Sequence, residues 1–174
     1  MIDTNYSVEA LDYLLVEECL PERYYPLIQH KKELITKSLK KGYKTKNDIL
    51  KLFDDELMTL GLKDEKEIKL MQRFLKLYDS KPIKFKEILK LDLGKEEKQV
   101  FEELYYLPGV KHIRASLYYR SGYKSLEDIA KTNVDEVLKR TAVAISKYNL
   151  SCIVPLPKEI RTHIVVAKAF TENK

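Results

Sequence analysis

Apolar residues recur every three or four positions through several stretches of the chain, which is the spacing of one face of an α-helix. Residues 8–20 carry Leu11, Leu14, Leu15 and Cys19 in this pattern, and Ser7 before them is a typical N-cap residue. The same reasoning predicts helices over residues 22–41, 64–78 and 158–170. The run 164–167 inside the last of these would also suit a strand, although no partner strand is evident nearby.

A segment that begins at Gly42 returns 80 residues later at Gly122. Over the 15 aligned positions of 42–56 and 122–136, eight residues are identical. A match of this extent indicates two divergent copies of one helical unit. We place the boundary between the copies near residues 79–82, because Pro82 cannot continue a preceding helix.

Each copy carries the local signals of a helix end followed by a short helix. Gly42 can adopt the left-handed conformation that closes a helix C-terminus. Thr45 can then cap the next helix, and Asp48, three residues on, resembles the acidic member of a capping box. Acidic residues at 54–56 predict one more helix start. The equivalent residues of the second copy are Gly122, Ser125, Asp128, Asp135 and Glu136.

Composition agrees with a helical protein. Charged residues make up 34% of the chain, while glycine and proline number only five and six, so there are few of the residues that sheets and hairpins need in their turns. We expect an all-α protein built from two tandem small helical modules. The first module covers residues 1–80 and includes the N-terminal helix, and the second covers residues 81–174 and includes the C-terminal helix.

The chain shows no sign of a membrane segment. Its longest stretch without a charged residue, Tyr148 to Pro157, is far shorter than the roughly 20 apolar residues that span a bilayer. The N-terminus lacks the basic start and apolar run of a secretory signal. Cys19 and Cys152 stand far apart without a metal-binding spacing, so we expect reduced core residues in a cytoplasmic protein.

The segment 107–115 (Leu-Pro-Gly-Val-Lys-His-Ile-Arg-Ala), together with 122–130, resembles the helix-hairpin-helix superfamily. The resemblance implies that backbone N–H groups at the start of the second helix of the hairpin face a nucleic-acid phosphate. Lys111 stands where that family has its second hairpin glycine; it adds a positive charge but puts a side chain at the point of close approach. The nucleic-acid-binding residues that this implies are Gly109, Lys111, His112, Arg114, Arg120 and Lys124.

The first module also resembles a sterile alpha motif. The resemblance rests on three short segments, 48–50 (Asp-Ile-Leu), 55–57 (Asp-Glu-Leu) and 60–62 (Leu-Gly-Leu). Domains of that family often bind other proteins. The alternative to nucleic-acid binding is therefore a helical protein-interaction or scaffold protein.

The distribution of charge is uneven. Residues 1–30 hold six acids and one base, whereas residues 31–51 hold eight lysines and two acids. Between residues 108 and 131 there are five bases against Glu127 and Asp128, which allows a weak positive patch on the second module.

No convergent catalytic set is evident. His30, His112 and His163 each stand alone, and Cys152 with His163 lacks the flanking pattern of a nucleophile and its base. We expect no catalytic site, no metal site and no cofactor. Three adjacent tyrosine pairs should each place one ring in the core and leave the other half exposed. These pairs are Tyr24-Tyr25, Tyr105-Tyr106 and Tyr118-Tyr119.

Overall fold

The protein is all-helical, as the sequence predicts. A computed structural model describes residues 2–79 and 82–172, and within these ranges eleven α-helices and three 3₁₀ helices occur without a strand. The elements of the first half are η1 (Val8–Ala10), α1 (Leu11–Leu14), η2 (Glu22–His30), α2 (Lys31–Lys40), α3 (Lys46–Leu50), α4 (Asp54–Met58) and α5 (Glu65–Lys76). Those of the second half are α6 (Pro82–Lys86), η3 (Ile88–Lys90), α7 (Lys95–Leu104), α8 (His112–Arg120), α9 (Leu126–Lys131), α10 (Val134–Tyr148) and α11 (Pro157–Thr171).

The prediction of one continuous α-helix is wrong for two of the four segments. In place of residues 8–20 the chain forms the short η1 and α1, with Ser7 as the predicted N-cap, and then turns. In place of 22–41 it forms the 3₁₀ helix η2 followed by α2. Pro26 lies inside η2, where it has no N–H to donate to an α-helical bond. The helices predicted at 64–78 and 158–170 are confirmed as α5 and α11, so the strand alternative at 164–167 is wrong.

The two repeat copies adopt the same local geometry. Gly42 and Gly122 have φ of +86° and +96°, values that favour glycine. The residue after each glycine donates its backbone N–H back into the preceding helix, from Tyr43 to the Ser38 carbonyl at 2.9 Å and from Tyr123 to the Tyr118 carbonyl at 3.0 Å. The hydroxyls of Thr45 and Ser125 then accept from the backbone N–H of Asp48 and Asp128, as predicted.

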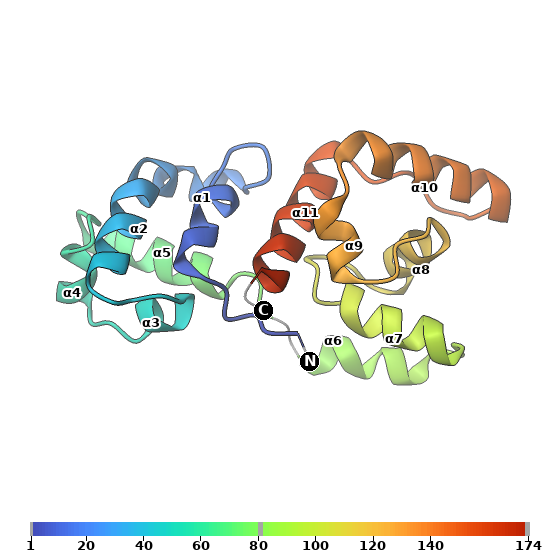
Figure 1. Cartoon of the computed structure of the whole chain (residues 1–174), viewed down its shortest axis with the longest axis horizontal. Coiled ribbons are helices and arrows are strands. Elements are labelled where there is room, and N and C mark those ends of the chain that lie inside the picture. The colour runs from blue at the N-terminus through green and yellow to red at the C-terminus, as the bar shows by residue number, and fades with distance from the viewer. Residues whose placement is uncertain (1, 80–81, 173–174) are drawn as a thin grey trace.

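Helix α11 connects the two halves of the chain. Figure 1 shows α1 to α5 on one side and α6 to α10 on the other, with α11 between α1 and α9. The Thr162 hydroxyl donates to the carbonyl of Cys19 at 2.7 Å, and the Tyr13 hydroxyl donates to Glu172 at 2.8 Å. The predicted boundary at residues 80 and 81 lies outside the described residues. Because α11 contacts helices from both sides of it, the division into two modules stays a prediction.

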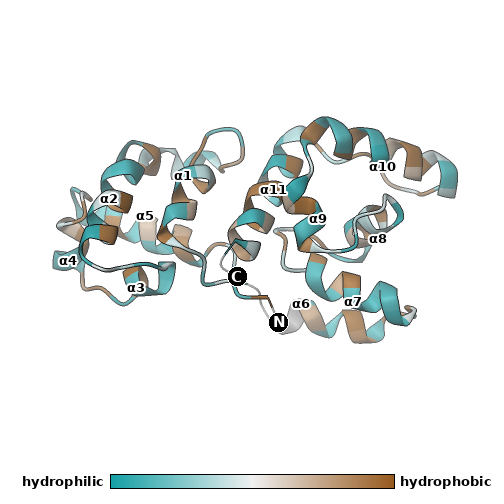
Figure 2. Cartoon of the chain, in the orientation of Figure 1, coloured by the Kyte–Doolittle hydropathy of each residue, from teal (hydrophilic) through white to brown (hydrophobic). Residues whose placement is uncertain are grey.

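The apolar faces of the helices form the core. Figure 2 shows most helices banded in hydrophilic and hydrophobic segments, the appearance expected of amphipathic helices. In each tyrosine pair the first ring is buried and the second half-buried, which confirms the predicted arrangement. No helix within the described residues is long and apolar enough to cross a membrane.

Candidate functional site

The segment 105–111 forms a tight hairpin between α7 and α8. Gly109 has φ of +72° and is exposed at the tip, while the side chain of Val110 is fully buried. The backbone N–H of Val110 donates to the carbonyl of Leu107 at 3.2 Å. The apolar residues on both sides of the glycine thus anchor the turn in the core and leave its tip in solvent.

His163 of α11 supports this hairpin from inside. Its Nε2 lies 2.8 Å from the carbonyl oxygen of Pro108, and its Nδ1 lies 2.7 Å from the Tyr118 hydroxyl. Burial lowers the pKa of His163 to about 4, so the ring is neutral at pH 7 and carries one N–H. Since a carbonyl oxygen only accepts, Nε2 donates to Pro108 and Nδ1 accepts from Tyr118.

Lys84 of α6 holds the same turn from the other side. Its ammonium group donates to the carbonyl of Leu107 at 2.8 Å. Burial, with a smaller contribution from the charge of Lys111, lowers the pKa of Lys84 to about 8. The carbonyls of Leu107 and Pro108 are therefore both occupied by partners from elsewhere in the protein.

The backbone N–H groups at the start of α8 face no such partner. The N-cap residue is Lys111, in an extended conformation, and no side chain among the described residues caps this helix. The start of α8 shares this property with α7 and α11, whereas α9 and α10 are capped by the side chains of Ser125 and Asn133. The start of α8 thus exposes N–H donors at the positive end of the helix dipole.

Four of the six predicted binding residues lie at this end of α8. Gly109, Lys111 and His112 are exposed, and the Lys111 ammonium lies 4.0 Å from a carboxylate oxygen of Glu87. Arg114 is largely covered. Its guanidinium pairs with Glu159 at 2.9 Å and donates to the carbonyl of Ile153 at 3.2 Å, so it joins α8 to α11 and to the loop before it.

The other two predicted residues lie away from the hairpin tip. Arg120 ends α8, with its guanidinium 5.0 Å from the ring centroid of Tyr148. Lys124 lies 3.6 Å from the ring centroid of Tyr119 and 3.9 Å from a carboxylate oxygen of Glu96. The structure therefore gathers Gly109, Lys111, His112 and Arg114, and separates Arg120 and Lys124 from them.

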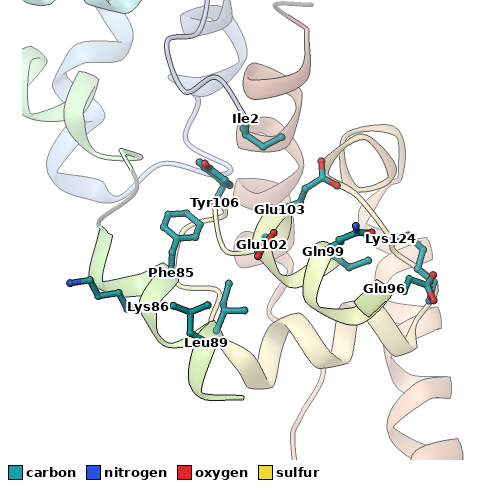
Figure 3. Close-up of a pocket in the computed structure, with 12 residues that line it drawn as sticks. Ile2, Phe85, Lys86, Leu89, Glu96, Gln99, Glu102, Glu103, Tyr106 and Lys124 are labelled. Atoms are coloured by element: carbon teal, nitrogen blue, oxygen red, sulfur yellow. Dashed lines mark ion pairs between the residues drawn. The ribbon is translucent and has the colours of Figure 1, made fainter. Parts of the chain in front are cut away.

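Lys124 borders a groove of about 810 Å³ between α6, η3 and α7. Figure 3 shows the groove, with Phe85 and Tyr106 at one end and Glu96, Gln99 and Lys124 at the other. Glu102 and Glu103 also line it. Three carboxylates against Lys86 and Lys124 disfavour a phosphate in this groove, so the hairpin is the better candidate for binding an anion.

The remaining candidate residues do not converge. His30 is buried beside Glu67, 3.0 Å from its carboxylate, whereas His112 is exposed. Within the described residues no three His, Cys, Asp or Glu side chains group as metal ligands. Cys19 is buried as predicted, but the expectation of a core residue is wrong for Cys152, which is half-buried in the loop after α10.

Two residues that support the hairpin, Lys84 and His163, carry no signal in the sequence. They lie 23 and 55 residues from the carbonyls that they bind, and neither belongs to a motif. No protein family, curated protein or solved structure matches this chain. The helix-hairpin-helix resemblance therefore stays a prediction that rests on the residues of the hairpin.

Proposed function

We propose that the protein is a non-catalytic binding module that holds a nucleic-acid backbone, independently of sequence, at the hairpin between α7 and α8. The uncapped start of α8 carries this proposal. Lys111, His112 and Ile113 at this start are exposed, and no side chain among the described residues caps their N–H groups. Phosphate oxygens accept hydrogen bonds from such N–H groups and gain from the helix dipole.

The fixed shape of the hairpin supports the same function. Because Lys84 and His163 hold the carbonyls of Leu107 and Pro108, the turn is already fixed before a ligand binds, which lowers the cost of ordering it. The ammonium of Lys84 also adds a partly buried positive charge behind the turn. Phosphate contacts of this kind carry no base information, so binding is independent of sequence.

The test is fluorescence anisotropy of a labelled DNA duplex of about 20 base pairs at two salt concentrations. Lys111→Glu places a carboxylate at the hairpin, and we expect affinity at low salt to fall by about tenfold or more. Lys66→Glu, an exposed change of equal charge on α5, is the matched control and should change affinity far less. Unchanged binding by Lys111→Glu would refute the proposal.

A second candidate function is protein binding, and a separate observation favours it. The loop before α11 exposes Ile153 by 76% and Leu156 by 67%, and Ile113 on α8 is exposed by 58%. Arg114 joins this loop to α8 through its bond to the Ile153 carbonyl. Exposed apolar side chains near one another are typical of surfaces that meet another protein.

Sedimentation of the purified protein, with a pull-down from a cell extract, tests this second function. Ile153→Ser and Leu156→Ser together should abolish self-association or the capture of a partner and leave the fold intact. A strictly monomeric wild-type protein that retains no specific partner would count against protein binding.

A further inference from the structure

A second cationic site lies at the opposite end of α8 from the hairpin. The end of α8 and one face of α10 enclose a groove of about 270 Å³. The charged and aromatic residues that line it are Arg120, Glu136, Lys139, Arg140, Lys147 and Tyr148. Four cationic side chains therefore meet one carboxylate.

That carboxylate is already engaged. Glu136 accepts from the guanidinium of Arg140 at 2.8 Å, one helical turn away on α10. Arg120, Lys139 and Lys147 have no carboxylate within ion-pair distance among residues 2–79 and 82–172. Three positive charges without a carboxylate partner thus line one small groove, which favours an anion there.

Tyr148 organises two of these charges. The Arg120 guanidinium lies 5.0 Å from the centroid of its ring, and the Lys147 ammonium lies 5.3 Å from the same centroid. The ring is 41% exposed. One aromatic ring thus contacts cations from two helices, and a bound anion would add a favourable interaction with both.

The groove and the hairpin share a surface of α8. His112, Ser116 and Arg120 are four residues apart in turn, so they lie on one face of the helix. Eight residues of α-helix extend about 12 Å. Along one strand of a duplex this distance corresponds to roughly three or four nucleotides.

We infer that the groove between α8 and α10 binds a second phosphate segment of the same nucleic acid that the hairpin holds, so that the backbone follows the exposed face of α8. This inference rests on the proposed function of the hairpin. The ligand chemistry is a phosphodiester chain, met by Arg120, Lys139 and Lys147 as hydrogen-bond donors and charges. Tyr148 serves to position the cations of Arg120 and Lys147.

The experiment measures duplex affinity at several salt concentrations for the full chain and for Lys139→Glu with Lys147→Glu. The exposed pair Lys32→Glu with Lys66→Glu on α2 and α5 provides a control of equal charge. We expect the groove variant to bind about tenfold or more weakly than the control and to lose about two from the slope of log affinity against log salt. The milder pair Lys139→Gln with Lys147→Gln should lower the slope in the same direction and guards against a loss of folding.

The outcomes separate the two proposals. If Lys111→Glu binds the duplex more weakly but the groove variant has the same affinity as its control, the second site is overturned. The hairpin function then stands. If the groove variant binds more weakly and Lys111→Glu is unaffected, the hairpin function is overturned, and with it the shared path of the backbone along α8; only binding by the basic groove remains. Absence of duplex binding by the wild-type protein at low salt overturns both.

Discussion

His163 makes the stability of the protein depend on pH. Burial lowers its pKa in the folded protein from the ordinary 6.5 to about 4. The unfolded chain therefore binds the proton more readily than the folded protein does. The contribution of His163 to stability is fully present above about pH 6.5 and falls as the pH drops towards 4, because protonation favours the unfolded chain.

The hydrogen bonds of the His163 ring explain why its protonation is unfavourable in the folded protein. Protonated His163 would donate from both ring nitrogens, so the Tyr118 hydroxyl, which now donates to Nδ1, would have to reverse its role. The gap between a pKa of 6.5 and one of about 4 corresponds to about 3 kcal/mol when fully developed. Of this, about 2 kcal/mol should be lost between about pH 7 and about pH 4.5.

Urea unfolding at these two pH values measures the loss. His163→Gln removes the titrating ring and keeps an amide, so it should reduce the loss of stability by about 2 kcal/mol even if it is less stable at neutral pH. Carboxylates such as Asp48, whose pKa backbone N–H bonds lower, also contribute in acid, but they do so equally in both proteins. If the wild-type protein and His163→Gln lose equal stability, this account of the ring is refuted.

Two further predictions concern the folded repeats. Gly122→Ala should cost about 1 kcal/mol of unfolding free energy, because its φ of +96° strains a residue with a Cβ. Gly94→Ala should cost less, because Gly94 has φ of −65° and no atom lies within 4 Å of the added Cβ. Chemical denaturation of both variants measures the difference, and equal losses would contradict the argument. Asp79→Ala should destabilise the protein more than Lys46→Met does. Asp79→Ala leaves the ammonium of Lys46, a side chain that is 2% exposed, without its ion-pair partner, whereas Lys46→Met removes the buried charge. The thermal midpoints of the two variants decide this, and the reverse order would contradict it.

The helix ends show how far local sequence reaches. Gly42 and Gly122, with the hydroxyls of Thr45 and Ser125, define their turns through bonds to residues at most five positions away. Such bonds join residues that are close in the sequence, so they can be predicted from it. The same locality made the internal repeat a reliable guide to the all-α fold.

Lys46 shows where local reasoning fails. It aligns with Leu126 of the second copy, and both side chains are buried, although a lysine at this position reads as part of a solvated face. Its burial depends on Asp79, 33 residues away, and on the Tyr6 ring, 5.1 Å from its ammonium group. Only the tertiary structure brings those partners to it.

The candidate binding surface also has features that follow from local sequence and features that depend on the tertiary structure. The sequence by itself determined the hairpin, its exposed glycine and the basic residues beside it, because these features lie within about ten consecutive positions. Only the tertiary structure decided that Arg114 is paired with Glu159, that Lys84 and His163 hold the turn, and that Lys139 and Lys147 join Arg120 in a groove. The physical reason is that a turn is stabilised by its own neighbours, whereas a charged surface is the sum of helices that pack together from distant parts of the chain.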